Sequence, residues 1–218
     1  MKKLLFLLAL FPLNLLAQES DFGNWWIYLG DKKINSRFNW HHEAQYRNYN
    51  FIGDLEQLLL RTGLGYNLSP QNNNLLLGYG FIQSEPYEGE TQEKLRIDEH
   101  RIYQQFIHKK TISRSTIQHR LRFEQRFIEQ DFKTRFRYFL AINIPLSSKG
   151  IVEDSFYLSG YNEVFLNTTS EINFDRNRVY AGLGFRFSKY IRSEIGVMNQ
   201  STSTTGRNQL NLITFVNL

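Results

Sequence analysis

Long runs in which apolar and polar side chains alternate one by one constrain this chain more than any other feature. Residues 57–68 show the pattern clearly, with Leu58 and Leu60 on one face and Arg61 on the other. A period of two places successive side chains on opposite faces of a β-strand. The same alternation recurs from Arg37 to the last residue, between clusters of Asn, Ser, Gly, Asp and Pro. The sequence therefore predicts an all-β fold.

The alternating segments are long enough to cross a membrane. A strand that crosses a bilayer needs about 9–11 residues, whereas strands of soluble sheets average about 5–6. Ten long segments are expected, at residues 37–47, 57–68, 74–84, 97–110, 116–127, 132–144, 155–167, 177–187, 190–199 and 209–218. Residues 25–29 form an eleventh, shorter one. We predict an antiparallel up-and-down transmembrane β-barrel of about ten to twelve strands.

The connections between these segments differ in length. Short connections are expected at 69–73, 111–115 and 188–189, and long ones at 84–96, 168–176 and 200–208. Short periplasmic turns and long outer loops give such a rhythm in outer-membrane barrels. Counted from residue 37, ten strands would begin and end at the same side of the membrane.

The first residues have the order of a secretory signal peptide. Lys2 and Lys3 precede an apolar run at 4–16, and Ala17 precedes polar residues. We expect cleavage after Ala17, so that residues 18–218 form one barrel domain. The chain has no cysteine, which excludes a lipoprotein anchor, disulfides and thiol chemistry. Its mean hydropathy of −0.44 argues against a helical inner-membrane protein.

Alternation alone leaves two opposite arrangements open. A transmembrane barrel turns its apolar face outward, whereas an exported soluble β protein turns it inward. Aromatic residues such as Trp40, Tyr66, Phe127 and Tyr190 lie near the ends of the expected strands, where interfacial aromatic girdles occur. The last strand also keeps one apolar face up to Leu218, as barrels recognised by the insertion machinery usually do. Both features favour the transmembrane barrel and localisation in the outer membrane of a Gram-negative cell.

Several runs resemble the domain-of-unknown-function 2490 family. They are HRLRFEQRF at 119–127, RFRY at 135–138, YNEVFLN at 161–167, FDRNR at 174–178, EHRIYQQ at 99–105 and EIGVMNQ at 194–200. The resemblance covers nearly all of the chain after the leader. It implies an outer-membrane barrel without an assigned activity, and it transfers no catalytic residue.

The polar faces of the expected strands carry many charged side chains. On the lipid face at mid-membrane, Arg or Lys would cost about 2–4 kcal/mol each, so we expect these side chains to face the lumen. The predicted charged network of the lumen consists of Arg37, Glu43, Arg47, Arg61, Glu99, Arg101, Arg120, Arg122, Glu124, Arg126, Arg135, Arg137, Glu163, Arg178, Arg186, Arg192 and Glu194. Arginine outnumbers glutamate in this set.

Three functions are compatible with such a lumen. In the first, glutamates bridge the arginines and close a structural barrel. In the second, unpaired arginines line a narrow pore or binding channel for anionic small solutes. In the third, the chain is an outer-membrane hydrolase, with His41 and His42 beside Glu43 as the only candidate bases, although no serine is placed to join them.

The expected partners follow from the barrel. We expect outer-membrane lipid and the barrel insertion machinery as partners, with anionic small solutes as candidate ligands, and a monomeric chain. The net charge of +5 does not indicate nucleic acid, because an exported chain does not meet it. No cofactor, metal site or catalytic residue is expected, since the five histidines form no metal-binding spacing.

Overall fold

A computed structural model describes residues 22–69, 72–89 and 93–218. The predicted signal peptide at 1–17 lies outside the described residues. The described residues form eleven strands: β1 (Phe22–Lys33), β2 (Phe38–Asn48), β3 (Leu55–Asn67), β4 (Asn73–Ser84), β5 (Ile97–Ile112), β6 (Ser115–Ile128), β7 (Asp131–Pro145), β8 (Ser155–Asn167), β9 (Asn173–Arg186), β10 (Ile191–Ser201) and β11 (Gly206–Asn217). No helix in this part of the chain is long and apolar enough to cross a membrane.

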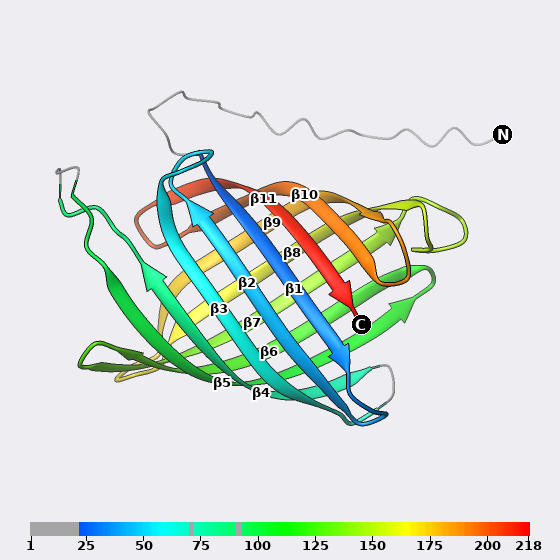
Figure 1. Cartoon of the computed structure of the whole chain (residues 1–218), viewed down its shortest axis with the longest axis horizontal. Coiled ribbons are helices and arrows are strands. Elements are labelled where there is room, and N and C mark those ends of the chain that lie inside the picture. The colour runs from blue at the N-terminus through cyan, green and yellow to red at the C-terminus, as the bar shows by residue number, and fades with distance from the viewer. Residues whose placement is uncertain (1–21, 70–71, 90–92) are drawn as a thin grey trace.

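The strands close into one barrel, in which each strand pairs with its neighbours in the sequence and β1 pairs with β11 (Figure 1). All the pairs between neighbours in the sequence are antiparallel, but the closing pair is parallel, with Trp26 opposite Leu212 and Tyr28 opposite Thr214. An odd number of strands requires this, because the first and last strands then run in the same direction. The predicted barrel is confirmed, with eleven strands and one parallel seam.

The two chain ends of the barrel lie at opposite rims. We call the rim that carries Leu218 and the turns after β1, β3, β5, β7 and β9 the C-terminal rim, and the other the N-terminal rim; Figure 1 shows them at the right and the left. The expected ten strands, β2–β11, do begin and end at the same rim. β1 is the additional strand that places its start, Phe22, at the N-terminal rim.

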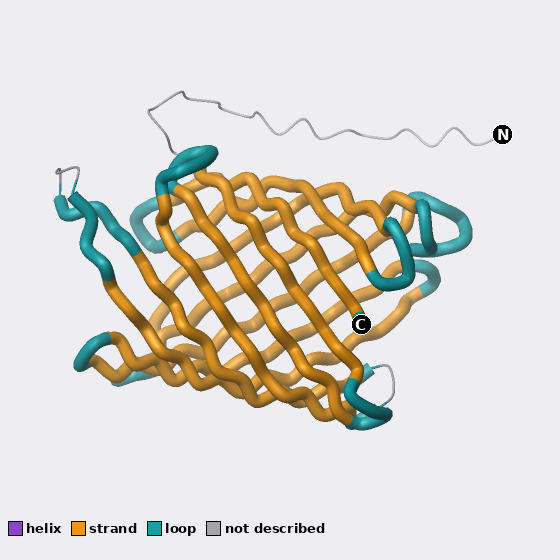
Figure 2. The backbone as a smooth tube through the Cα atoms, in the orientation of Figure 1, coloured by secondary structure: helices purple, strands orange, loops and turns teal. Residues whose placement is uncertain are grey.

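The connections do not alternate in length as expected. The N-terminal rim carries the longest connection, 85–96, but also the two-residue turn 129–130. The C-terminal rim carries the two-residue turn 113–114, but also the loop 146–154. β9 and β11 begin earlier than their alternation indicated and β10 ends later, so the expected long loops 168–176 and 200–208 shrink to 168–172 and 202–205. Figure 2 shows the loops and turns at both rims, with strands between them. The predicted rhythm is therefore wrong, and length does not mark one rim as the outer one.

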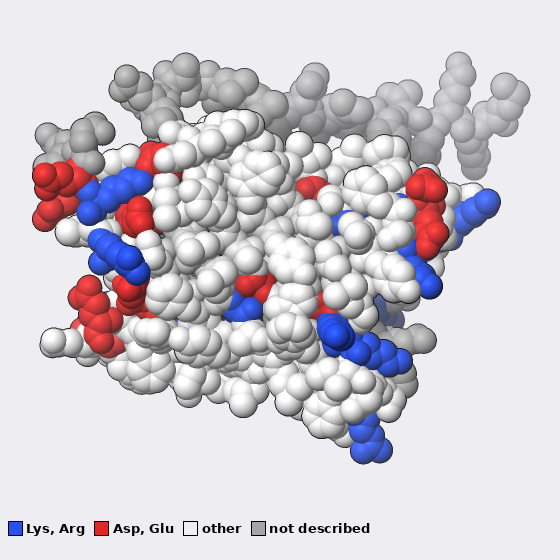
Figure 3. All heavy atoms as spheres, viewed as in Figure 1, with Lys and Arg blue, Asp and Glu red and all other residues white. Residues whose placement is uncertain are grey.

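Apolar side chains cover the outside of the wall. Leu64, Leu140, Val179 and Ile195 are exposed there, whereas charged side chains of the same strands are buried in the lumen. On the face shown in Figure 3, acidic and basic side chains gather mainly at the two ends and leave a largely uncharged band between them. The alternation thus places its apolar face outward.

Exposed aromatic rings mark both ends of this band. Near the N-terminal rim they are Trp26, Tyr46, Phe127, Phe132 and Phe174. Near the C-terminal rim they are Phe38, Trp40, Phe156, Phe187 and Tyr190. Two such rows, one near each rim, are arranged like the aromatic girdles of membrane-spanning barrels.

Glycines make room for rings that lie flat against the inner wall. A Cβ atom at Gly184 would stand 2.2 Å from the ring of Tyr157, and one at Gly78 would stand 2.2 Å from the ring of Tyr103. Both tyrosines are fully buried. These positions need glycine because each ring packs directly over the backbone of a neighbouring strand.

Candidate functional site

Four buried glutamates on four strands organise the lumen. Glu43 lies on β2, Glu99 on β5, Glu124 on β6 and Glu163 on β8, and each is at most 5% exposed. The period of two turns each of them inward, together with the arginines two residues away on the same strand or opposite on the next. Buried carboxylates require charged or hydrogen-bonding partners, and these arginines supply them.

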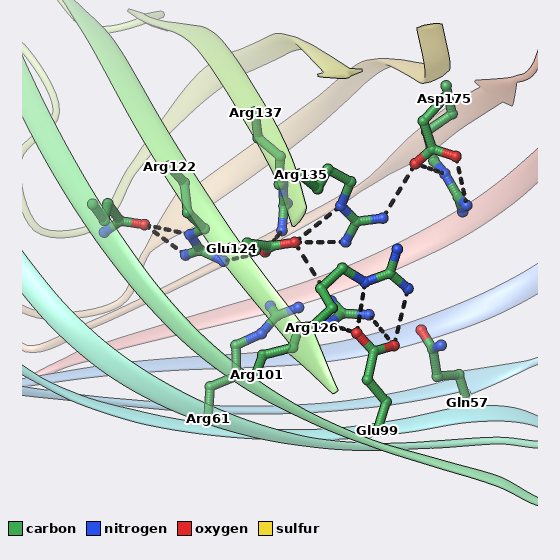
Figure 4. A network of polar contacts seen from close by, with 12 residues as sticks. Gln57, Arg61, Glu99, Arg101, Arg122, Glu124, Arg126, Arg135, Arg137 and Asp175 are labelled. Atoms are coloured by element: carbon green, nitrogen blue, oxygen red, sulfur yellow. Dashed lines mark hydrogen bonds and ion pairs between the residues drawn. The ribbon is translucent and has the colours of Figure 1, made fainter. Parts of the chain in front are cut away.

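Glu124 lies at the centre of the network and has no exposed surface (Figure 4). Its Oε2 accepts hydrogen bonds from Nη2 and Nε of Arg135, at 2.6 and 3.0 Å. Its Oε1 accepts one from Nη1 of Arg137 at 2.6 Å. Arg101 and Arg122 approach the same carboxylate at 3.9 and 3.7 Å. The register of β6 and β7, which sets Glu124 opposite Arg135, produces this contact.

Glu163 joins two further strands, β8 and β9, to this centre. Its Oε1 accepts hydrogen bonds from Nη2 and Nε of Arg137, at 2.7 and 3.0 Å, and from Nη2 of Arg120 at 2.6 Å. Arg178, opposite Glu163 on β9, lies 3.9 Å from its other oxygen. Arg137 therefore bridges Glu124 and Glu163. The charged contacts run without a break through β6, β7, β8 and β9.

The other two glutamates extend the network across the lumen. Glu99 receives paired hydrogen bonds from Arg101, at 2.5 and 2.8 Å, and from Arg126, at 2.6 and 3.0 Å. Glu43 accepts a hydrogen bond of 2.5 Å from Arg61. Two parallel N–H···O bonds between a guanidinium and a carboxylate are among the strongest and most directional of protein hydrogen bonds. This part of the lumen is accordingly held in a fixed geometry.

Aromatic rings in the lumen complete the environment of the arginines. The guanidinium carbon of Arg47 lies 3.7 Å from the ring centre of Trp25, and those of Arg137 and Arg178 lie 4.4 and 4.7 Å from that of Phe165. A cation over an aromatic face is attracted by the ring quadrupole, more so when both are shielded from water. The ring contacts thus add to the ion pairs of Arg137 and Arg178 and stabilise Arg47, which has no carboxylate partner among the described residues.

Sequence reasoning did not identify these rings or the glutamines that bind arginine. Oε1 of Gln105 accepts two hydrogen bonds from Arg122, at 2.8 and 2.6 Å, and Gln45 and Gln57 accept from Arg47. The sequence did contain a signal for these residues. Each of them lies an even number of positions from a charged residue of its own strand, or faces a charged residue on the neighbouring strand. They were not predicted because only charged residues were considered as members of the network.

Most of the predicted network residues meet in this cluster, but four lie apart. Arg37 is exposed in the turn between β1 and β2. Arg186 donates to the backbone oxygens of Ile151, Ser188 and Lys189 at the C-terminal rim. Arg192 packs over the ring of Phe215 at 4.0 Å, and Glu194 accepts a hydrogen bond from Tyr157.

The network divides the free space in the lumen. A cavity of about 560 Å³ extends from the C-terminal rim inward, and a small one of about 60 Å³ lies on the other side. Arg47, Arg61, Arg137 and Arg178 line both cavities. These four side chains and the glutamates they contact form the partition between them.

The histidines do not assemble catalytic geometry in the described part of the chain. Nδ1 of His41 lies 3.2 Å from Asp31 and its Nε2 lies 3.6 Å from Glu43, so carboxylates face both ring nitrogens. His42 is on the outer face, where its ring packs against Tyr28 and Trp40. Within residues 22–69, 72–89 and 93–218, no group of three or more His, Asp or Glu side chains could hold a metal ion.

Comparison with known proteins yields one match. The model of a family described as "Protein of unknown function (DUF2490)" matches residues 22–211, which covers every strand except the last residues of β11. The resemblance noted in the sequence is confirmed. No curated protein and no solved structure matches the chain.

Proposed function

The chain belongs to the DUF2490 family, whose description assigns no activity, and from its geometry we propose that it is a monomeric outer-membrane β-barrel with a sealed lumen. The leader predicted at residues 1–17 would export it, and the barrel insertion machinery would place it in lipid. The barrel would act as a closed structural unit and not as an open channel.

The polar groups of the outer face support the membrane part of this proposal. They are hydrogen bonded to one another along the wall: Tyr79 to His100 at 2.6 Å, Trp40 to Thr62 at 2.8 Å and His119 to Tyr138 at 2.8 Å. Water would satisfy such groups on a soluble surface, but hydrocarbon leaves them only each other. Together with the aliphatic band and the two aromatic rows, these pairs favour lipid as the surrounding medium.

The position of Glu124 carries the proposal of a sealed lumen. Glu124 has no exposed surface, is bonded to two arginines of the next strand and is approached by two more. These contacts support a lumen that is closed to solute at the middle of the barrel. Porins with aqueous channels have about 16–18 strands, whereas barrels of about eight strands are filled by their own side chains. With eleven strands, this barrel is closer in size to the filled kind.

Conductance across a planar lipid bilayer tests this function. The reconstituted wild-type barrel should pass almost no current. Arg137→Ala, which removes the bridge between Glu124 and Glu163, should raise the current from this baseline, because the partition loses its central side chain. Arg37→Ala, at the exposed turn, is the matched control and should change nothing.

A narrow anion pathway is the second candidate, favoured by the excess of arginine over glutamate in the lumen. It predicts that the variants change the current in the opposite direction in the same experiment. The wild type would carry an anion-selective current, and Arg137→Ala or Arg135→Ala would lower it. That outcome would refute the sealed barrel.

A further inference from the structure

The cavity at the C-terminal rim has the composition of a ligand site. Its volume of about 560 Å³ falls within the range of about 300–1,000 Å³ that is usual for small-molecule pockets. It reaches from rim residues such as Lys189 and Asn217 down to Arg122 and Glu163 in the network. It is therefore open to a solute at one end and closed at the other.

The charges that line this cavity are unbalanced. Arginines and lysines outnumber the three glutamates, Glu43, Glu163 and Glu194, and all three already accept hydrogen bonds from within the barrel. The charge of the lining is not neutralised by these carboxylates. An anion in the cavity would supply the missing negative charge.

Two cations near the rim have no acidic partner. Among the described residues, neither Lys109 on β5 nor Arg192 on β10 has a carboxylate within ion-pair distance, and both line the cavity. Asp31, at the same rim, is engaged by Asn39 and His41. Lys109 and Arg192 come from different sides of the wall, so their charges converge on the space between them.

Deeper in the cavity, hydrogen-bond donors also lack acceptors. Nε of Arg61, Nε of Arg120 and Nη1 of Arg122 are buried without a hydrogen-bond partner in the described part of the protein. Buried donors of charged groups are costly to leave unpaired. Like the unpaired cations at the rim, they indicate a shortage of acceptor oxygens in this half of the lumen.

One wall of the same cavity is apolar. Ile27 and Leu29 of β1 lie beside Ile213 and Phe215 of β11, in direct register across the parallel seam, and all four line the cavity. They pack against or belong to the cluster of buried side chains around Trp25 inside the barrel. An apolar strip in an otherwise charged lumen offers a surface for the hydrocarbon part of a ligand.

We propose that this cavity binds a small amphiphilic acid, one anionic head group on an apolar body. The head, a carboxylate or a phosphate, pairs with Lys109 and Arg192, and the body lies against the β1–β11 strip. The proposed contacts use only the lining of the cavity, so the site requires neither a lumen sealed to ions nor the surrounding membrane. Binding can therefore be measured in detergent, separately from conductance.

The fluorescence of Trp25, which lines the cavity, can report binding. In the full-length mature barrel carrying Trp26→Phe and Trp40→Phe, Trp25 is the only tryptophan, since the chain has three. The probes are 3-phenylpropanoate, the neutral 3-phenylpropanol, and acetate, which has the head without the body. We expect saturable binding of 3-phenylpropanoate, and much weaker binding of the other two.

Charge-neutral variants assign the head-group site. Lys109→Gln with Arg192→Gln should weaken 3-phenylpropanoate binding about tenfold or more, the loss of a charged hydrogen-bonded contact, and leave 3-phenylpropanol unchanged. Lys133→Gln, at the N-terminal rim, is the control. Heat-modifiable migration in gels verifies that each variant is folded.

Two results would overturn the proposal. Equal affinity of the wild type and the double variant for 3-phenylpropanoate would remove Lys109 and Arg192 from the site. Acetate binding as tightly as 3-phenylpropanoate would show that the apolar strip takes no part. A conducting wild-type barrel that still binds the acid would refute the sealed lumen and leave the binding site standing.

Discussion

Glu124 connects more arginines than any other single carboxylate of the central network. Two guanidinium groups bind it directly, and two more lie within 4 Å. A buried ion pair adds little net stability over an apolar pair, but removal of one partner leaves the other charged groups uncompensated. The network therefore makes the barrel sensitive to single changes at its centre.

We predict that Glu124→Gln lowers the free energy of unfolding by about 3–5 kcal/mol, the cost of breaking a buried ion pair. Arg135 and Arg137 would lose their shared charged acceptor while remaining in the lumen. Unfolding by urea in detergent, followed by tryptophan fluorescence, measures the change. Glu171→Gln, in the exposed turn between β8 and β9, is the matched control. If both variants unfold at the same urea concentration, the network does not hold the fold.

A second group of charged contacts lies outside the barrel wall, at the N-terminal rim. It joins the loop after β2 to the loop after β4. The phenol of Tyr87 donates a hydrogen bond of 2.8 Å to Asp54, and Lys94 forms an ion pair with the same carboxylate. Burial raises the pKa of Asp54, but the hydrogen bonds from Lys94 and Tyr87 outweigh it, and the net pKa is lowered. The hydrogen bond to Asp54 and burial both raise the pKa of Tyr87.

The lowered pKa fixes the direction of a pH effect. Asp54 stabilises the loop pair above the ordinary pKa of an aspartate, about 3.9, and this contribution is lost as the pH falls through the lower folded value. We predict that the amides of Tyr49 and Leu95, which bond to Asp54 and Pro86, lose hydrogen-exchange protection in that acidic range. In the Asp54→Asn variant, these two amides should be weakly protected from hydrogen exchange at every pH. The amide of Leu68, at the other rim, is the reference and should not respond.

At the scale of the strand, the parallel seam is the unusual element. Bacterial outer-membrane barrels of a single chain have even strand numbers and close antiparallel. Here β1 and β11 run side by side in the same direction over ten residue pairs. The position of β1 also supplies the apolar strip of the C-terminal cavity, so the seam shapes the lumen as well as closing the wall.

Paired cysteines test the seam. The chain contains no cysteine, so Tyr28→Cys with Thr214→Cys introduces a single possible disulfide between opposed positions. We predict that it forms on oxidation of the folded barrel and is visible as a shift in non-reducing gels. Tyr28→Cys with Leu210→Cys, four residues out of register, should not cross-link, because a disulfide needs Cα atoms about 4.4–6.8 Å apart. The reverse pattern would contradict the parallel register.

The flat tyrosines make the inner wall sensitive to added volume. We predict that Gly184→Ala destabilises the barrel by about 1–3 kcal/mol, because the new methyl group overlaps the ring of Tyr157. Displacement of that ring would also break its hydrogen bond to Glu194. Gly160→Ala is the control, since the nearest atom to its added Cβ is 3.5 Å away. Equal urea midpoints for the two variants would exclude this packing.

At the scale of the whole molecule, the three tryptophans report which face meets lipid. Trp25 is 2% exposed in the lumen, whereas Trp26 and Trp40 are 48% and 45% exposed on the outside. These two lie near opposite rims, within the two aromatic rows. The distribution provides a direct measurement of the inside-out arrangement.

We predict that brominated lipids quench the fluorescence of barrels that retain only Trp26 or only Trp40, and leave a barrel that retains only Trp25 unquenched. Quenchers of this kind act on contact with the indole. The variants replace the other two tryptophans with phenylalanine. If Trp25 alone is quenched, the apolar face does not meet the lipid. If none is quenched in reconstituted vesicles, the barrel does not enter the bilayer.

Much of the wall could be predicted because strand periodicity is local. Whether Arg135 and Glu163 lie on the apolar or the polar face depends on their parity within one strand, which the neighbouring residues reveal. The same local pattern located the start of β6 and β7 to within one residue. It failed at β9 and β11, where polar residues at the strand starts resembled loops.

The sequence by itself thus determined the class of fold, the long strands and the gathering of the charged side chains on one face of each strand, since each follows from alternation along a single segment. The inward direction of that face was expected from the length of the strands and from the cost of charge against lipid. Only the tertiary structure decided that eleven strands close through a parallel seam, and that Arg137 bridges Glu124 and Glu163. It also decided that an amphipathic cavity remains at one rim. These features depend on how strands far apart in the chain are staggered around the barrel, and no local pattern encodes a distance across the lumen.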